Sequence, residues 1–258
     1  MLEFILIIVS GFAAGLLNSV AGGGTFFTLP VLIMIGTHPT IANATATLSA
    51  LPGYLSSAWA YRKDIQAEGV FSLQKILVIS CIGGLLGAVL LTITSEEAFL
   101  WIIPFLLLIA TVLFAMNPFI MRSIQKRNSE GLGPLMSGSA IFVVSVYGGY
   151  FNGGLGIMLL AMLGLIGFKN LHGMNGLKTI LSAILSFVSA FVFIAAELIA
   201  WEYILPMAIS NAFGGYIGAY YIRKVVRTEI LKTFIVLVGL AMTITFFMHN
   251  FSHTLLDT

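Results

Sequence analysis

Long apolar runs dominate the chain, and they follow one another in two sets of five. A membrane-spanning helix needs about 20 predominantly apolar residues, and the third, fourth and fifth runs of each set reach that length. The pattern therefore predicts helices that cross a membrane several times. The apolar runs are 2–20, 25–36, 40–60, 71–93 and 98–117 in the first half, and 135–152, 155–168, 173–199, 203–222 and 229–248 in the second.

The second run of each set is too short to span a membrane comfortably, and a glycine cluster separates it from the first run. Backbone that is broken at membrane depth is tolerated only where protein or a water-filled cavity surrounds it. We therefore expect the first two runs of each half to form a glycine-broken re-entrant or short-helix hairpin. The glycines are Gly22, Gly23 and Gly24 in the first half, and Gly153, Gly154 and Gly156 in the second.

The two halves resemble each other in sequence. A shift of 132 residues places Gly22 on Gly154 and Asn43 on Asn175, and it also pairs Gly24 with Gly156 and Thr47 with Thr179. A shift of 131 residues places Gly83, Gly84 and Gly87 on Gly214, Gly215 and Gly218. Several matches at nearly one shift, with the apolar runs in the same order, predict an internal duplication.

Composition narrows the class of protein. The apolar fraction is 59% and the charged fraction is 9%, whereas a soluble domain carries about a quarter charged residues. The chain therefore lacks the polar surface of a soluble protein. A net charge of +2 gives no indication of nucleic acid binding, and the single cysteine, Cys81, excludes an intrachain disulfide and a cysteine-based zinc site. We expect no metal and no cofactor.

The basic residues predict the orientation in the membrane, because cytoplasmic loops carry an excess of lysine and arginine. Eleven of the twelve lie in or beside the segments 61–71, 118–134, 169–172 and 223–228, whereas the loops near 37–39, 94–97 and 200–202 carry none. Both termini are then extracytoplasmic. The first repeat (1–117) and the second (135–258) have opposite orientations on either side of a cytoplasmic linker (118–134). The expected fold is an all-α integral membrane protein of two inverted repeats, each a hairpin plus three transmembrane helices.

The helices after the glycine breaks carry the first candidate chemistry. The N-terminus of a helix presents unpaired N–H groups and about half a positive charge, which favour an anion. Inverted repeats place such a site near the membrane midplane. The alternative is that the glycines only allow close helix packing. The expected substrate-binding residues here are Gly22, Gly23, Gly24 and Thr25, with Gly153, Gly154 and Gly156.

A second group of polar residues opens the third helix of each half. Asn43 and Thr47 are four residues apart, and Asn175 and Lys178 are three apart, so each pair shares a helix face; Thr179 follows directly. Lys178 lies inside an apolar run, where a charge is costly and indicates function. The alternative is that Lys178 extends to the cytoplasmic interface, and that the neutral residues form bonds between helices.

Chemistry that the sequence lacks is also informative. No carboxylate lies in the middle of an apolar run, and no Cys/His pair or metal cluster occurs, which argues against an enzyme and against a proton relay. An inside-negative potential favours exit of an anion by about 2.3 kcal/mol per charge per 100 mV. Facilitated export is therefore physically sufficient, and coupled uptake stays open.

Two motifs resemble a known family. Gly15-Leu-Leu-Asn-Ser-Val-Ala-Gly-Gly-Gly-Thr-Phe-Phe-Thr-Leu-Pro30, followed by Pro39-Thr-Ile-Ala-Asn43-Ala-Thr45, is similar to the opening signature of the TauE/SafE sulfite exporter family, also called the toluene sulfonate uptake permeases. Tyr150-Phe-Asn-Gly-Gly-Leu-Gly156 and His172-Gly-Met-Asn175-Gly-Leu-Lys178 resemble the equivalent element of one branch, although Leu155 stands where the first half has Gly23. The resemblance covers nearly the whole chain.

The resemblance implies transport of sulfite, organosulfonates or related small anions at the bacterial inner membrane. The expected function is transport of a small anion by alternating access at a midplane site, with export as the direction. A passive anion channel and an uptake permease for another small organic anion are the alternatives. The expected partners are the small anion and the lipid bilayer, without nucleic acid, and a homo-oligomer stays open.

Overall fold

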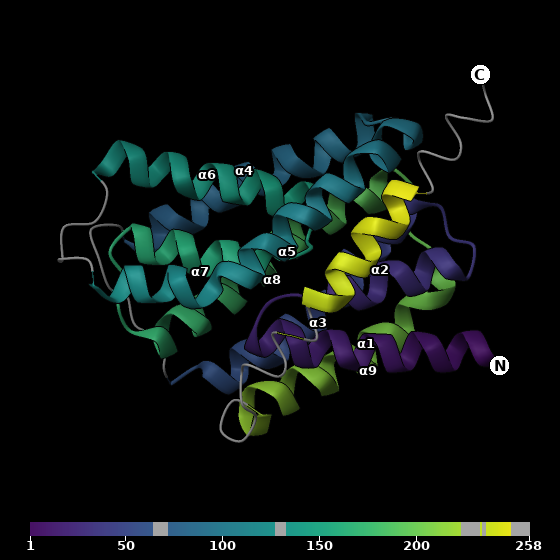
Figure 1. The fold of residues 1–258 in the computed structure, drawn as a ribbon, viewed down its shortest axis with the longest axis horizontal. Coiled ribbons are helices and arrows are strands. Elements are labelled where there is room, and N and C mark those ends of the chain that lie inside the picture. Colours follow the sequence, from purple (N-terminus) through teal and green to yellow (C-terminus); the bar gives the residue numbers. More distant parts are fainter. Residues whose placement is uncertain (64–71, 127–132, 223–232, 234–235, 249–258) are drawn as a thin grey trace.

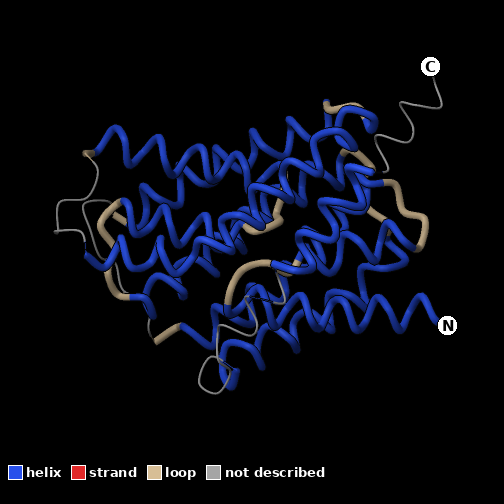
Figure 2. The backbone as a smooth tube through the Cα atoms, viewed as in Figure 1, coloured by secondary structure: helices blue, strands red, loops and turns tan. Residues whose placement is uncertain are grey.

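The described part of the chain is built from helices. The computed structural model describes residues 1–63, 72–126, 133–222, 233 and 236–248, and no strand occurs in these ranges. The order of long and short helices confirms the all-α, multi-pass prediction (Figures 1 and 2). The helices are α1 (Leu2–Val20), α2 (Thr25–Met34), α3 (Pro39–Tyr61), α4 (Leu73–Ile93), α5 (Glu96–Lys126), α6 (Pro134–Tyr150), α7 (Leu155–Leu165), α8 (Leu171–Ala195) and α9 (Trp201–Ile217), then the π-helix η1 (Gly218–Ile222) and a helix over Val236–Met248.

Among the described residues, four helices are long and apolar enough to cross a membrane. They cover Leu2–Val20, Leu73–Ile93, Glu96–Met116 and Gly173–Ala195. Helix α3 is as long as these, with 23 residues, but many of its residues are polar and buried. Helix α5 continues to Lys126, so the first part of the segment expected as a linker is helical.

The two short helices end in the same way. After α2, Gly36 has a φ of 93° and the N–H of Thr37 donates to the carbonyl of Leu32. After α7, Gly167 has a φ of 105° and the N–H of Phe168 donates to the carbonyl of Leu163. A glycine with positive φ followed by such a bond is the Schellman ending of a helix. The glycines at these positions therefore fix where both short helices stop.

Glycines also set the closest helix packing. The backbone of Gly214 lies against the backbone of Phe12, so α9 packs on α1 without a side chain between them. The backbone of Gly87 lies against that of Val146, so α4 packs on α6 in the same manner. Figure 1 shows α1 beside α9 at one edge of the molecule and α4 beside α6 at the other. The first helix of each half thus packs on the glycine-bearing fourth helix of the other half.

Helices α3 and α8 occupy the centre. They pack directly on each other, and 61% of the spanning window of α8 is buried, against 39% for α4 and for α5. The large apolar side chains of α4 are exposed along one face, as expected for a surface that contacts lipid. Polar side chains on α3 and α8 are buried inside this apolar shell.

Charged residues gather at the two ends of the helices. Glu3, Glu96 and Glu202 lie in the first turns of α1, α5 and α9. His38 pairs with Glu96 there, which ties the start of α3 to the start of α5. Residues 127–132, which follow α5 in the expected linker, and the C-terminal tail (249–258) lie outside the described residues. The side of the membrane on which each of them lies therefore stays a prediction.

Candidate functional site

The first glycine break follows α1 directly. The N–H groups of Ala21 and Gly22 both donate to the carbonyl of Leu17 at 2.7 Å, and Gly22 has a φ of 81°. The side chain of Asn18 accepts a hydrogen bond from the N–H of Gly24 at 2.7 Å, immediately before α2 begins at Thr25. The turn therefore needs a glycine for its backbone conformation and an asparagine for its hydrogen bonding.

The second glycine break also contains a glycine with positive φ, but it has a different stabilising contact. Gly154 has a φ of 72° and is the N-cap of α7. The hydroxyl of Tyr147 donates to the carbonyl of Gly153 at 2.6 Å. Gly22 and Gly154, which the 132-residue shift pairs, are thus both in the left-handed region of backbone conformation.

The two breaks touch each other. The N–H of Gly156 donates to the carbonyl of Gly22 at 3.4 Å, and a Cβ atom on either glycine would overlap the backbone of the other. Helix α5 closes one side of this contact, because Phe114 packs against Gly23 and Ala110 packs against Gly154. The structure therefore brings the glycines of the candidate site together, although they are far apart in sequence.

Most of the N–H groups at these helix starts already have partners. The N–H groups of Leu155 and Gly156 donate to the carbonyls of Asn152 and Gly22, and those of Ile157 and Met158 both donate to Gly154. At α2, the N–H groups of Gly24, Phe26, Phe27 and Thr28 are likewise bonded. The expectation of several unpaired N–H groups aimed at an anion therefore does not hold in this conformation, because hydrogen bonds within the turns and between the two breaks satisfy them.

Lys178 lies at the first break. Its side chain is 1% exposed, and its ammonium donates to the carbonyl of Ser19 at 3.3 Å and to the side-chain oxygen of Asn175 at 3.2 Å. The hydroxyl of Tyr61 donates to the same Ser19 carbonyl at 3.4 Å. The interfacial alternative requires the side chain of Lys178 to extend to the exposed surface. The buried position of that side chain does not meet this requirement.

Asn43 makes the corresponding contact at the second break. Its amide nitrogen donates to the carbonyl of Tyr150, the last residue of α6, at 3.0 Å. Its side-chain oxygen is buried without a hydrogen-bond partner in the part of the chain that the structure describes. A buried polar atom without a partner costs about 1–3 kcal/mol. Each central helix therefore reaches the break of the opposite half, α3 through Asn43 and α8 through Lys178.

The two threonines of the predicted site are less directly involved. The hydroxyl of Thr47 donates to the carbonyl of Asn43 in its own helix at 2.9 Å, and the hydroxyl of Thr179 donates to the carbonyl of Gly176 at 2.7 Å. Such bonds to the preceding turn are common for threonine in a helix. Thr25, at the start of α2, is buried.

Sequence reasoning missed a polar cluster between α3 and α8. The hydroxyl of Tyr54 donates to the side-chain oxygen of Asn152 at 3.0 Å, and the amide nitrogen of Asn152 donates to Ser186 at 3.1 Å. All three residues are buried. The 132-residue shift pairs Tyr54 with Ser186, and this was the signal available in the sequence. Ser19 was missed as well, because a backbone carbonyl leaves no pattern in a sequence. Tyr61 was missed with it, since its hydroxyl donates to that carbonyl.

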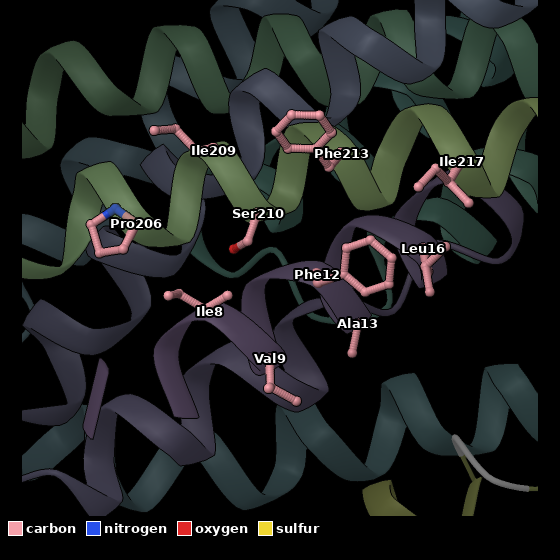
Figure 3. A pocket seen from close by; sticks show the side chains of 10 residues that line it. All are labelled: Ile8, Val9, Phe12, Ala13, Leu16, Pro206, Ile209, Ser210, Phe213 and Ile217. Carbon is pink, nitrogen blue, oxygen red and sulfur yellow. The ribbon is translucent and has the colours of Figure 1, made fainter. Parts of the chain in front are cut away.

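An apolar groove of about 720 Å³ lies elsewhere, on the surface between α1 and α9 (Figure 3). Its one hydroxyl-bearing lining residue is Ser210, and that hydroxyl donates to the carbonyl of Met207. No predicted site residue lines this groove, and it offers no charge to an anion. The lining residues are Ile8, Val9, Phe12, Ala13, Leu16, Pro206, Ile209, Ser210, Phe213 and Ile217.

Comparison with known proteins agrees with this architecture. The family described as "Sulfite exporter TauE/SafE" matches residues 7–246. The chain is 28% identical to "Probable membrane transporter protein ORF9" of Sinorhizobium sp over 244 residues, which cover 92% of this chain and 89% of that protein. It is 27% identical to a "Probable membrane transporter protein" of Haemophilus influenzae, covering 90% of each chain. It is 26% identical to "Probable membrane transporter protein YfcA" of Escherichia coli (strain K12), covering 84% of this chain and 81% of that protein.

Proposed function

The chain belongs to the sulfite exporter TauE/SafE family of membrane transporters, and we propose that it carries a small anion, such as sulfite, an organosulfonate or a related sulfur oxyanion, out of the cytoplasm. The proposed site lies where the two glycine breaks meet. It consists of the breaks themselves, with Lys178 and Asn175 from α8 and Asn43 from α3.

One observation carries the proposal. Lys178 is buried, and its ammonium contacts neutral oxygen atoms of Ser19 and Asn175. No ion pair with a carboxylate reaches it among the described residues. A buried charge without a counter-charge is costly, and such a residue inside a membrane indicates a functional site. An anion that binds beside Lys178 supplies the missing counter-charge.

The arrangement of the breaks supports alternating access. We infer that residues 1–117 and 135–258 are inverted repeats joined by the segment 118–134. Matching positive-φ glycines, matching Schellman endings and the crosswise packing of α1 on α9 and α6 on α4 all support this inference. Rocking of one repeat against the other would open the shared site to each side in turn.

Export follows from the orientation that the basic residues predict. With basic loops on the cytoplasmic side of a bacterial inner membrane, the inside-negative potential favours exit of each negative charge by about 2.3 kcal/mol per 100 mV. No buried carboxylate occurs among the described residues to serve as a proton relay. The potential alone is sufficient to drive export.

The test is anion flux in proteoliposomes that contain the purified protein, with and without an imposed potential. We expect saturable flux of sulfite or a sulfonate that follows the potential. Replacement Lys178→Ala should lower the transport efficiency by on the order of 10-fold or more, because it removes the buried charge. Lys75→Ala is the matched control, since Lys75 is exposed in the first turn of α4, and its flux should equal that of the wild type.

Two outcomes would overturn the proposal. If no sulfur oxyanion or sulfonate crosses the membrane, the assignment of an anion substrate is wrong. If Lys178→Ala transports every anion with unchanged affinity, the site is not at Lys178. Flux that rises linearly with concentration, together with unitary currents, would indicate a passive channel instead of a carrier.

A further inference from the structure

The described interior of the protein contains a single formal charge. Lys178 is the one buried side chain among the acidic and basic residues whose side-chain exposure the structure describes, and the others of that set are exposed at or near a helix end. These exposed residues are Glu3, Arg62, Lys63, Lys75, Glu96, Glu97, Arg122, Lys169, Glu197 and Glu202.

The helices packed against α8 add no second charge near Lys178. Helices α3, α6 and α7 contain no acidic or basic residue within their bounds. Helices α1 and α4 contribute only Glu3 and Lys75, and both of these are exposed in first turns. The contacts of the ammonium itself are the neutral oxygens of Ser19 and Asn175. The fixed charge available to a ligand from the described residues is therefore +1.

The helix ends do not supply a second charge in the usual way. An anion at a helix N-terminus is held by free N–H groups, but most of these groups at α2 and α7 are bonded within the two turns. The ammonium carries three N–H bonds, and its contacts with the neutral oxygens of Ser19 and Asn175 leave one for an anion oxygen.

From this charge count we propose that the site selects monovalent oxyanions, such as alkanesulfonates and hydrogensulfite, over divalent ones, such as sulfate and thiosulfate. The inference rests on the proposed function. A monoanion and the ammonium together form a neutral pair. A dianion of the same shape leaves one negative charge buried without a partner, and an unpaired buried charge is strongly unfavourable.

The test compares methanesulfonate with sulfate, which differ by a methyl group in place of a charged oxygen. Each is added as a competitor of sulfite flux in proteoliposomes that contain the full-length protein. We expect methanesulfonate to compete on the order of 100-fold more strongly than sulfate, as a few kilocalories of charge imbalance require. As the pH rises, sulfite flux should fall more steeply than methanesulfonate flux, because hydrogensulfite is converted into the dianion whereas methanesulfonate stays a monoanion.

Variants of Lys178 link the preference to the charge. Lys178→Arg keeps the charge and should retain most of the preference for methanesulfonate, whereas Lys178→Gln should weaken binding of methanesulfonate and reduce the ratio between the two competitors. Lys75→Ala is again the matched control, with an unchanged ratio. If Lys178→Gln cannot be purified in a folded state, the wild-type ratio and the pH dependence still decide the question.

The outcomes separate the two levels of the argument. If none of these anions is transported or competes, the proposed function itself fails. If flux is measurable but sulfate competes as strongly as methanesulfonate, the proposed function stands and the monoanion preference is wrong. A preference that persists unchanged in Lys178→Gln would also overturn the inference, because the discrimination would then come from the shape of the site.

Discussion

Replacement of Gly22 by alanine tests the contact between the two breaks. Gly22 has a φ of 81°, and a non-glycine residue in left-handed backbone costs roughly 1–2 kcal/mol. The added methyl group would also overlap the backbone of Gly156, whose nitrogen lies 2.8 Å from the position of that Cβ atom. Overpacking of this kind costs typically about 1–3 kcal/mol. The two effects together predict a loss of roughly 2–5 kcal/mol.

Two further glycines serve as matched controls that separate these effects. Gly36 has a φ of 93°, and nothing lies within 4 Å of its Cβ position, so Gly36→Ala should cost only the backbone term of about 1–2 kcal/mol. Gly156 meets the same contact from the other side without a positive φ. Gly156→Ala should therefore show the steric cost, reduced by about 1 kcal/mol because alanine favours a helix.

The assay is unfolding of purified protein in detergent, followed by tryptophan fluorescence and helical circular dichroism, together with anion flux. We expect Gly22→Ala to be the least stable of the three variants and to lose flux most severely. If Gly22→Ala is no less stable than Gly36→Ala, the two breaks do not touch as described. A Gly156→Ala variant that is more stable than the wild type and has unchanged flux would lead to the same conclusion, because only the helix-favouring effect of alanine would then remain.

Two other predictions follow from the buried cluster and from the proposed topology. Tyr54→Phe removes the donor to Asn152 and should lower the free energy of unfolding in detergent by about 1–3 kcal/mol. The control is Tyr216→Phe, at an exposed position, which should leave that free energy unchanged. Equal effects of the two substitutions would refute a structural role for the Tyr54 bond. In a Cys81→Ser background, a membrane-impermeant maleimide added outside intact cells should label Thr258→Cys but not Glu130→Cys, and labelling of both from the same side would exclude the inverted arrangement.

Much of the architecture could be predicted from apolar run lengths and glycine positions. The two short helices appear where the runs at 25–36 and 155–168 are too short to span, and both begin just after a predicted glycine break. These features depend on local properties of the chain, namely helix length, backbone conformation at glycine and transfer of side chains to lipid. Lys178 was also visible, because a single basic residue inside an apolar run stands out.

Other features could not be predicted, because they depend on contacts between distant segments. Asn18 bonds Gly24 within its own break, but the side chain of Asn152 joins α3 to α8 through Tyr54 and Ser186. The N–H groups expected to be unpaired are bonded in the turns, partly across the two halves through Gly22 and Gly156. No local pattern specifies which distant carbonyl a buried donor meets.

The sequence by itself thus determined that this protein is a bundle of membrane helices with two broken segments and one isolated interior lysine, because burial in lipid and glycine backbone freedom act on neighbouring residues. Only the tertiary structure decided that the two breaks touch, and that the lysine lies on the carbonyl of Ser19 without a carboxylate. Those facts arise from the packing of helices that lie more than a hundred residues apart in the chain, since the lysine and that carbonyl are separated by 159 positions.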